Sequence, residues 1–365
     1  RWWENKVWKS PGKPSGGMVD TLLRPLGELY GKIAAKPPRE VHRAPCPVIS
    51  IGNLTVGGSG KTPFVIHLAG VIQSRFLKRV AIISRGYGKK NRHEVSLVSD
   101  GERILCDPFE AGDEAYLTAY NVPGAIVITA PDRVKAAQLA VEKCGAQVIL
   151  LDDGFQHRRL ARQMDVVLID GERGLGNRRC FPAGPLREPL GAIRRANWLV
   201  IYRRGGASAC KPPEEVLAGI DLSGLKVLEV ESSTQKLRSA HSHKAGLAHI
   251  SLGPMESGLI TKPWLLVSGI AYPQSFEKSV RQQGLIIAGH RIFEDHHGYT
   301  TGDWQGLIQE AKQKSCAGIL TTEKDFWKLM ALGKWPEEIQ VGILSVEIIS
   351  GKGWEDFLKE LGDRP

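Results

Sequence analysis

The chain has 365 residues, more than a single domain core usually accommodates, and its 42% hydrophobic and 24% charged residues are typical of a soluble globular protein. Its formal net charge of +10 favours anionic partners, without choosing among nucleotides, nucleic acids, phosphorylated substrates and membrane surfaces. No apolar run approaches the length of a membrane span, and the six cysteines include no C-x-x-C pair, which argues against a zinc site or a disulfide framework. A reducing cytoplasm is the environment that fits these six cysteines most simply.

The segment from 17 to 36 has the period of an amphipathic helix, because apolar residues recur every three or four positions. These residues are Met18, Leu22, Leu26, Leu29, Tyr30 and Ile33. Basic residues flank the segment and three tryptophans precede it, a mixture that suits a helix lying on an anionic membrane. The alternative is a helix packed on the body of the domain with its charges solvated, and both can hold for different faces.

Residues 49–62, ISIGNLTVGGSGKT, form an apolar strand that runs into a glycine-rich loop ending in Gly-Lys-Thr. With a helix predicted from 63 to 71, this is the strand–loop–helix setting of a phosphate-binding loop. Backbone N–H groups of such a loop surround a phosphate, the lysine meets the β- and γ-phosphates, and the threonine hydroxyl binds Mg²⁺. The predicted nucleotide-binding residues are Thr55, Val56, Gly57, Gly58, Ser59, Gly60, Lys61 and Thr62.

The loop departs from the usual G-x-x-x-x-G-K-T spacing, which would place a glycine at Thr55. Glycines stand instead at Gly57, Gly58 and Gly60. An ordinary glycine-rich turn before a helix is the alternative interpretation. It does not account for the Lys-Thr pair after Gly60, since a turn does not require one.

Apolar runs at 80–83, 126–129 and 148–151 alternate with helical segments, which predicts a parallel sheet with helices on both faces. The last of these runs ends at Asp152 and Asp153. Two carboxylates at the end of a buried strand are costly unless they hold a cation or a proton, and a phosphate-loop protein places its Mg²⁺-associated aspartate there. A simple helix cap is the alternative.

Two further runs, at 166–169 and 198–202, continue the predicted sheet, and the proline-rich loop 181–189 between them presents Arg187 and Glu188. Residues 231–262 have a looser pattern and are predicted to be a linker. Its His241 and His243 lack neighbouring cysteines or carboxylates, which favours a solvated loop over a metal site.

A second alternating block after the linker predicts a smaller α/β domain. Its strands are expected at 264–267, 284–288, 318–321 and 341–346, and its helices at 273–283 and 302–314. The polar segment 293–299 between them is rich in groups that exchange protons. The predicted division is therefore a first domain at 1–230, a linker at 231–262 and a second domain at 263–365.

Together the motifs resemble those of the tetraacyldisaccharide 4'-kinases of lipid A synthesis. The motifs are GNLTVGGSGKTP at 52–63, SRGYG at 84–88, GDE at 112–114, LDDGFQH at 151–157, PAGPLREP at 182–189, GIAYP at 269–273, FEDHHGYT at 293–300 and TTEKD at 321–325. They span most of the chain in the expected order.

The resemblance implies transfer of the γ-phosphoryl group of ATP, with Mg²⁺, to the 4'-hydroxyl group of a tetraacylated glucosamine disaccharide 1-phosphate, giving lipid IVA. It also implies two α/β/α domains, the larger a P-loop kinase-like domain with a parallel sheet and the smaller Rossmann-like, joined by a strand-containing linker. The expected location is peripheral, on the anionic cytoplasmic face of the bacterial inner membrane.

The family's functional residues carry over onto matching positions. Those implied to be catalytic are Asp113, His296 and Lys61, with Asp113 and His296 resembling the pair that takes the hydroxyl proton. The implied metal ligands are Thr62, Asp152, Asp153 and Glu188. The residues implied to bind substrate are Tyr87, Arg133, His157 and Arg187. Without the resemblance, Asp113 and His296 would be interpreted as a structural aspartate in a loop cap and a solvated histidine.

Two other functions are considered. A phosphate-loop GTPase would need a guanine-reading N-K-x-D tetrad, which the sequence lacks. A basic nucleic-acid-binding ATPase would interleave arginines with stacking aromatic residues along a groove, whereas the tryptophans here precede an amphipathic helix. No nucleic-acid partner is expected, and the chain is expected to be a monomer.

Overall fold

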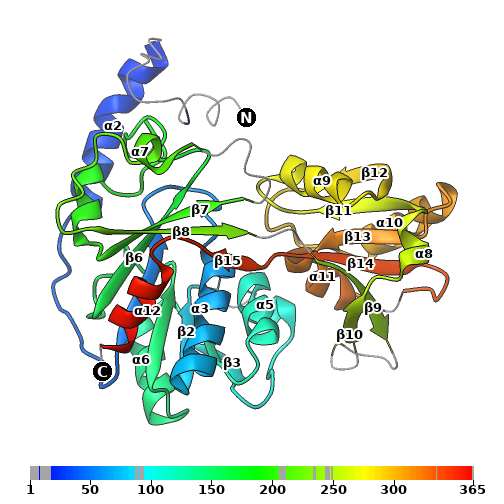
Figure 1. Cartoon of the computed structure of the whole chain (residues 1–365), viewed down its shortest axis with the longest axis horizontal. Helices are drawn as coiled ribbons and strands as arrows, with labels where there is room; N and C mark the ends of the chain where they lie inside the picture. The colour runs from blue at the N-terminus through cyan, green and yellow to red at the C-terminus, as the bar shows by residue number, and fades with distance from the viewer. Residues whose placement is uncertain are drawn as a thin grey trace. The chain divides into compact units, whose positions relative to one another are not determined.

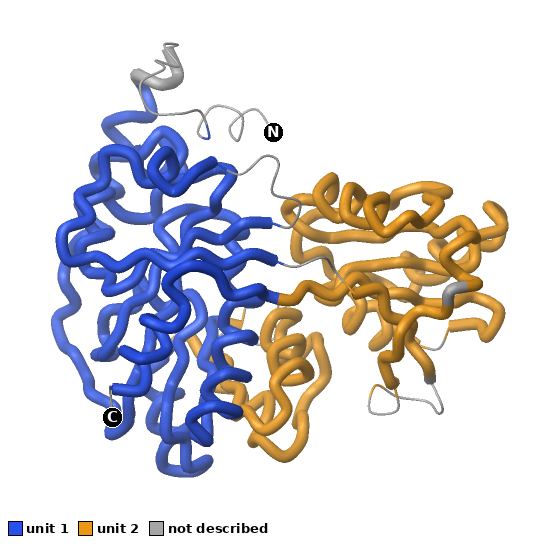
Figure 2. Tube along the Cα trace, in the orientation of Figure 1, with its two compact units in different colours: residues 1–85, 132–232, 348–365 blue, residues 86–131, 233–347 orange. Residues whose placement is uncertain are grey.

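The computed structural model describes residues 8, 18–86, 89, 94–204, 211–232, 236–242, 247, 250–333 and 335–363. The chain forms two compact units that alternate along the sequence (Figure 2). Unit 1 contains residues 1–85, 132–232 and 348–365, and unit 2 contains residues 86–131 and 233–347.

Unit 1 carries the strands and helices around the glycine-rich loop (Figure 1). In chain order they are α2 (Met18–Ala34), β1 (Val48–Asn53), α3 (Lys61–Phe76), β2 (Val80–Ser84), α6 (Arg133–Glu142), β5 (Val148–Asp152), β6 (Met164–Asp170), the 3₁₀ helix η1 (Leu190–Arg195), β7 (Trp198–Arg203), α7 (Pro213–Val216), β8 (Lys226–Ser232), β15 (Ile348–Ser350) and α12 (Trp354–Gly362).

The strands of unit 1 follow the order β15-β8-β7-β6-β1-β5-β2 in their sheet. All neighbouring pairs from β8 to β2 are parallel, and β15 joins antiparallel to β8. Strands β1, β5 and β6 are buried along their whole length, as expected for a parallel sheet covered on both faces. Because β1 and β5 are parallel neighbours, the loops that follow them leave the sheet at the same edge.

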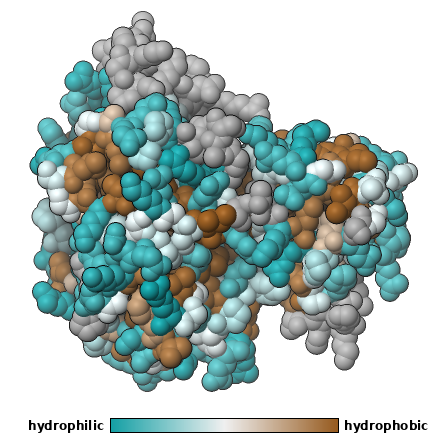
Figure 3. Space-filling model, in the orientation of Figure 1, coloured by the Kyte–Doolittle hydropathy of each residue, from teal (hydrophilic) through white to brown (hydrophobic). Residues whose placement is uncertain are grey.

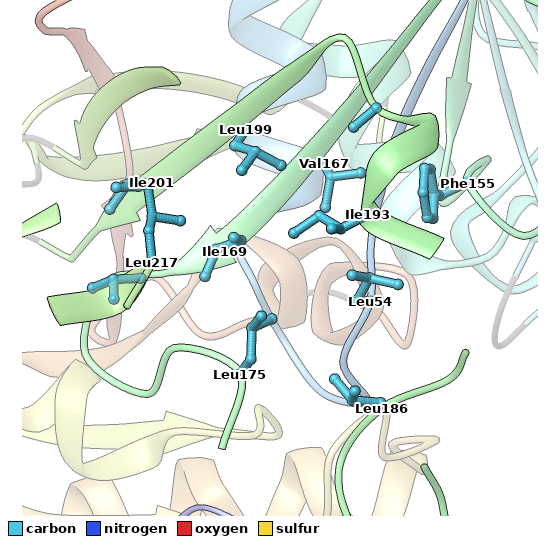
Figure 4. Close-up of a cluster of buried hydrophobic side chains, with 12 residues drawn as sticks. Leu54, Phe155, Val167, Ile169, Leu175, Leu186, Ile193, Leu199, Ile201 and Leu217 are labelled. Carbon is cyan, nitrogen blue, oxygen red and sulfur yellow. The ribbon is translucent and has the colours of Figure 1, made fainter. Parts of the chain in front are cut away.

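Three loops of unit 1 share one hydrophobic core (Figure 4). Leu54 follows β1, Phe155 follows β5, and Leu186 belongs to the proline-rich loop; all three are fully buried. They pack with side chains of β6 and β7 in the same cluster. Burial of these apolar residues therefore holds the three polar motifs next to one another.

The other face of this sheet is covered by α3 and α12. The Phe64 ring of α3 lies 6.3 Å from the Phe357 ring of α12, which in turn makes an edge contact with Trp198 of β7 at 5.3 Å. The C-terminal helix thus belongs to unit 1, although it follows unit 2 in the sequence.

Unit 2 contains a six-stranded sheet and an antiparallel pair of strands with two short helices. Its elements are β3 (Ser96–Asp100), α4 (Pro108–Ala111), α5 (Asp113–Asn121), β4 (Ile126–Thr129), β9 (Lys236–Ser242), β10 (Ile250–Pro254), α8 (Ser257–Ile260), β11 (Pro263–Ser268), α9 (Pro273–Gln282), β12 (Ile286–Ile292), α10 (Thr301–Gln313), β13 (Gly318–Thr322), α11 (Glu323–Met330) and β14 (Gln340–Ser345).

The six-stranded sheet of unit 2 has the order β10-β9-β14-β13-β11-β12. Its four C-terminal strands are parallel, and β9 and β10 add antiparallel at one edge. Helix α11 packs against α5, where the Trp327 ring lies 5.4 Å from Tyr116 and 4.2 Å from Tyr120. This aromatic contact joins residues 86–131 to the later part of unit 2.

The predicted α/β class with mainly parallel sheets is confirmed. The predicted domains were contiguous ranges, whereas the compact units interleave: residues 86–131 group with unit 2, and residues 348–365 return to unit 1. The predicted linker contains β9 and β10, which belong to the second sheet. The strand expected at 284–288 is β12, which runs further, to Ile292.

The amphipathic helix predicted at 17–36 is confirmed as α2, and its two faces have different surroundings. Four apolar side chains on one stripe, Leu22, Leu26, Leu29 and Ile33, are each more than half exposed. On another face, a Cβ atom at Gly27 would lie 2.7 Å from the Cys180 carbonyl oxygen, and one at Gly31 would lie 3.0 Å from the Cys180 Sγ atom. The glycines therefore let the helix approach the proline-rich loop closely, while the apolar stripe faces outward.

The end of α2 is held by the loop that follows β5. The Arg158 guanidinium donates to the carbonyl oxygens of Ala34 and Ala35 at 3.1 and 3.2 Å, and also to that of Lys36. These last carbonyl groups lack partners within the helix, so a cation satisfies them well.

The described helices include none long and apolar enough to cross a membrane. In the view of Figure 3, hydrophobic residues form several patches among the hydrophilic residues of the described surface.

Candidate functional site

The glycine-rich loop between β1 and α3 has the backbone conformation that its glycines permit. Gly57 and Gly60 have φ values of 100° and 79°, a region that side chains with a Cβ rarely adopt. At Gly60 a Cβ atom would also lie 2.5 Å from the Tyr202 ring. The loop can therefore turn its N–H groups inward at the start of α3, as a phosphate-binding loop requires.

Thr55, which stands where a glycine is usual, has a different backbone role. It forms an antiparallel bridge with Leu186 of the proline-rich loop. Beside it, Val56 N donates to the Pro185 carbonyl at 2.8 Å, and Arg187 N donates to the Leu54 carbonyl at 2.7 Å. A bridge position does not need a glycine, and it ties the loop to the segment that carries Arg187.

Asp153 lies between two cations. Its Oδ1 atom is 3.4 Å from Lys61 Nζ, and both of its carboxylate oxygens lie 2.8 Å from Arg187 Nη1. Burial alone would raise the pKa of Asp153, but the charges of Lys61 and Arg187 outweigh it and hold that pKa well below its usual value. Asp153 is therefore ionised and fixes both cationic side chains next to the loop.

Thr62 and Asp152, the chain neighbours of Lys61 and Asp153, provide oxygen atoms. Thr62 Oγ1 lies 3.4 Å from Asp152 Oδ2, at the end of the buried strand β5. Nearby, the Ser59 hydroxyl and the Asn53 amide are buried without a hydrogen-bond partner among the described residues. Such buried polar atoms are costly unless a ligand satisfies them.

Glu188 has a partner in this structure. Both of its carboxylate oxygens accept hydrogen bonds from Arg195, at 2.9 and 3.0 Å, and the Arg195 guanidinium lies 4.4 Å above the Phe155 ring. This bidentate geometry is a strong form of ion pair. The role of Glu188 as a metal ligand stays a prediction, and a cation would have to compete with Arg195 for it.

Two of the predicted substrate residues, the buried Arg133 and the half-buried His157, lie close enough for the charge of Arg133 to act on the imidazole. Burial, followed by the charge of Arg133, lowers the pKa of His157 to about 4, so the imidazole is neutral at pH 7. Its Nε2 atom is buried without a hydrogen-bond partner among the described residues. Arg187, a third predicted substrate residue, contacts Asp153 as described above. Tyr87, the fourth, lies outside the part of the chain that the structure describes.

Asp113 and His296 meet within unit 2, although 183 residues separate them. Asp113 is the first residue of α5, and its Oδ2 atom lies 3.0 Å from His296 Nδ1. Burial opposes the ionisation of Asp113, but the hydrogen bond from His296 and the charges of Lys324 and Lys328 lower its pKa well below the usual value. The aspartate is therefore a poor base, and its hydrogen bond with Nδ1 leaves Nε2 of the histidine as the basic atom.

The hydrogen bond to Asp113 raises the pKa of His296, although burial opposes this. A histidine oriented by a carboxylate is a suitable proton acceptor near neutral pH. His296 itself has a φ of 61°, a strained value for a non-glycine residue.

Two lysines of α11 complete this group and were not assigned a role from the sequence. Lys324 Nζ lies 3.2 Å from His296 Nε2, and Lys328 Nζ lies 3.4 Å from Asp113 Oδ2. Lys324 belongs to the TTEKD motif and Lys328 follows it in the chain, and their spacing of four places both on one face of a helix. That spacing was the available signal, but exposed lysine pairs on helices are common and it does not identify a site.

The comparisons with known proteins agree along most of the chain. Residues 19–362 match the family model described as tetraacyldisaccharide-1-P 4'-kinase. The chain is 40% identical over 288 residues to the tetraacyldisaccharide 4'-kinase of Desulfotalea psychrophila, covering 79% of this chain and 80% of that protein. It is 36% identical over 345 residues to that of Syntrophus aciditrophicus, with 90% of each chain covered.

A solved structure is also similar. LpxK from Aquifex aeolicus, in a crystal structure in complex with ATP, superposes with a TM-score of 0.71 at 31% identity, covering 94% of this chain and 98% of that one. The family match over residues 19–362 includes the phosphate-binding loop, Asp113 and His296. The chain belongs to the tetraacyldisaccharide 4'-kinase family.

Proposed function

We propose that the protein transfers the γ-phosphoryl group of ATP to the 4'-hydroxyl group of tetraacyldisaccharide 1-phosphate, giving lipid IVA. The observation that carries the proposal is the group around the phosphate-binding loop, where Lys61 and Thr62 contact Asp153 and Asp152. Phosphoryl transfer needs positioning and charge neutralisation more than covalent help, and this group supplies fixed cations beside backbone N–H donors.

The residues at this loop fit Mg²⁺. The ion prefers oxygen ligands, keeps several waters and is usually held by one or two carboxylates together with substrate phosphates. Thr62 Oγ1 and Asp152 Oδ2 are such donors, and the described residues contain no cluster of three or more His, Cys, Asp or Glu side chains that would form a closed metal site. Bound there, Mg²⁺ would neutralise charge on the phosphates.

Lys61 and Arg187 contribute cationic groups whose positions are set before the nucleotide binds. Asp153 contacts both of them, so neither side chain has to be ordered at the moment of reaction. Fixed charges of this kind stabilise the charge that spreads over the transferred phosphoryl group.

His296 is the proposed acceptor of the 4'-hydroxyl proton. Asp113 holds its Nδ1–H, so Nε2 presents a lone pair, and the resulting imidazolium would be stabilised by the same carboxylate. Arg133 and His157 are proposed to contact the substrate, as is Tyr87.

Helix α2 is proposed to bring the protein to its lipid substrate, as a peripheral protein on the cytoplasmic face of the inner membrane. The exposed stripe Leu22, Leu26, Leu29 and Ile33 supports this, since such side chains gain about 1.5 to 3 kcal/mol each at most when buried. The excess of basic residues in the chain adds attraction to anionic lipids that weakens with salt.

The test is direct. The full chain is incubated with Mg-ATP and tetraacyldisaccharide 1-phosphate in detergent, and mass spectrometry follows the lipid. We expect a product heavier by one phosphate group, lost in Lys61→Ala and retained in Lys78→Ala, a change at an exposed lysine of the same unit. ATP consumption that depends on single-stranded DNA but not on the lipid would instead support a nucleic-acid-dependent ATPase.

A further inference from the structure

Lys324 contacts the nitrogen of His296 that faces away from Asp113. Its Nζ atom lies 3.2 Å from His296 Nε2 and 3.1 Å from Asp295 Oδ1. Because Nδ1 of His296 lies against the Asp113 carboxylate, the hydrogen of a neutral imidazole is assigned to Nδ1. The ammonium group of Lys324 therefore donates to the lone pair of Nε2, the same lone pair that would accept a substrate proton.

Charged groups from three elements face His296. Asp113 and Glu114 lie on α5, Asp295 precedes His296 in its loop, and Lys324 lies on α11. Lys328, on the same helix, contacts Asp113. The carboxylates favour a protonated imidazole. The lysine at 3.2 Å opposes this, because protonation would place two positive charges side by side.

We infer that Lys324 is a positioning residue for His296: its ammonium group holds the imidazole through Nε2 and keeps that nitrogen unprotonated until the acceptor hydroxyl replaces it. The inference deepens the proposed function and rests on it for the role of Nε2 as the base. The contact itself does not depend on that function. Without Lys324, the carboxylates would favour protonation of His296 more strongly, and a protonated His296 could not accept a proton.

Lys328 has a different set of contacts. Its Nζ atom lies 3.4 Å from Asp113 Oδ2, 3.0 Å from the His297 carbonyl oxygen and 3.4 Å from Asp325 Oδ1. It therefore helps to hold the aspartate and the adjacent loop. Of these two lysines, Lys324 is the one placed to control Nε2.

Titration of His296 by NMR in the full chain tests the contact without any substrate. The variants are Lys324→Met, Lys324→Gln and Lys324→Arg, and His296→Gln identifies the resonance. The matched control is Lys312→Met, which removes a lysine of unit 2 from an exposed ion pair with Glu338. Melting temperatures check that each variant is folded, and Lys324→Gln serves if Lys324→Met is not.

We expect the pH of half-protonation of His296 to rise by about 1 in Lys324→Met or Lys324→Gln. Lys324→Arg, which keeps the charge, and the Lys312→Met control are expected to stay close to the unchanged protein. A half-protonation pH that stays the same or falls in the neutral variants overturns the inference.

The dependence of kcat/KM on pH tests the consequence for the reaction. In Lys324→Met the acid limb is expected to move to higher pH by the same amount, so that activity on that limb falls about tenfold, with a much smaller loss above it. An equal loss at every pH would contradict a control of protonation and identify a substrate contact or a purely structural role. If the unchanged protein transfers no phosphate to the lipid, the proposed function fails, while the NMR titration still decides whether Lys324 controls His296.

Discussion

Arg187 and Asp153 form an ion pair in which one guanidinium nitrogen lies 2.8 Å from both carboxylate oxygens. Lys61 approaches the same carboxylate from the phosphate-binding loop, at 3.4 Å. One buried anion therefore sets the positions of two cations that come from different loops. The same ion pair therefore contributes to the stability of unit 1 and positions the cations proposed to act in the reaction.

The first prediction concerns the stability of this group. Asp153→Asn leaves Lys61 and Arg187 facing each other without the anion, and breaking a largely buried pair in this way costs up to about 3 kcal/mol in the free energy of unfolding. The pKa of Asp153 is depressed in the folded state, so its ionic contribution is present above about pH 4 and is lost as the pH falls toward the folded-state value. Urea unfolding at several pH values measures both effects.

The difference between the unchanged protein and Asp153→Asn should therefore shrink as the pH falls below about 4. Asp356→Asn, at an exposed position of α12, controls for the loss of a negative charge alone. A difference that stayed constant from neutral to acid pH would show that Asp153 contributes through packing and not through its charge.

The second prediction concerns the lysine of the phosphate-binding loop. Lys61→Ala removes the cation that is proposed to lie beside the nucleotide phosphates, so kcat should fall about 100-fold or more. The variant should stay folded, with a smaller loss of stability than Asp153→Asn, because Asp153 keeps Arg187 as a partner and Lys61 contributes no packing to the apolar core. Kinetic assays with Mg-ATP and the lipid acceptor measure this, and near-normal turnover in the purified variant would refute the assignment of the loop.

The third prediction treats Asp113 and His296 as one unit. Each single alanine variant should lose most of the activity, and the double variant should be little worse than the poorer single variant, because residues that act together lose activity non-additively. Steady-state kinetics of the two single variants and the double variant complete the cycle. Losses that multiply fully would leave two independent contacts in place of a pair.

The fourth prediction addresses the exposed stripe of α2. Leu26→Gln together with Leu29→Gln should weaken sedimentation with anionic vesicles about tenfold or more, and should raise KM for the lipid far more than KM for ATP. Binding by the unchanged protein should decrease at high salt. Leu77→Gln, which changes an exposed leucine elsewhere in unit 1, is the matched control. Equal vesicle binding by all three proteins would assign membrane docking to another surface.

The sequence predicted best those parts of the fold that are apolar throughout. Strand β5, with the sequence VILLD, was evident because both of its faces are buried. Strands β3 (SLVSD) and β8 (KVLEVES) were missed, since neither contains more than two consecutive apolar residues. The end of β12 was missed because its last residues include His290 and Arg291, which do not continue an apolar run.

The candidate site could also be predicted from the sequence only in part. The phosphate-binding loop and Asp152 could be predicted because parallel strands bring neighbouring loops to one edge of the sheet. The contact between Asp113 and His296 joins positions 183 residues apart, and only the resemblance to a family indicated it. The role of Lys324 could not be predicted, because the geometry at Nε2 of His296 depends on how α11 packs against α5.

The hydrogen bonds from Arg158 to the last carbonyl groups of α2 affect how the protein reaches its substrate. Arg158 stands six positions after Asp152 in the chain, so a few residues connect the carbonyl groups that end α2 to the proposed Mg²⁺ ligand. On the proposed membrane-bound protein, this short connection limits how far Asp152 can lie from the lipid surface on which α2 rests. A substrate whose acyl chains stay in the bilayer would then have to place its sugar within that distance of the lipid surface.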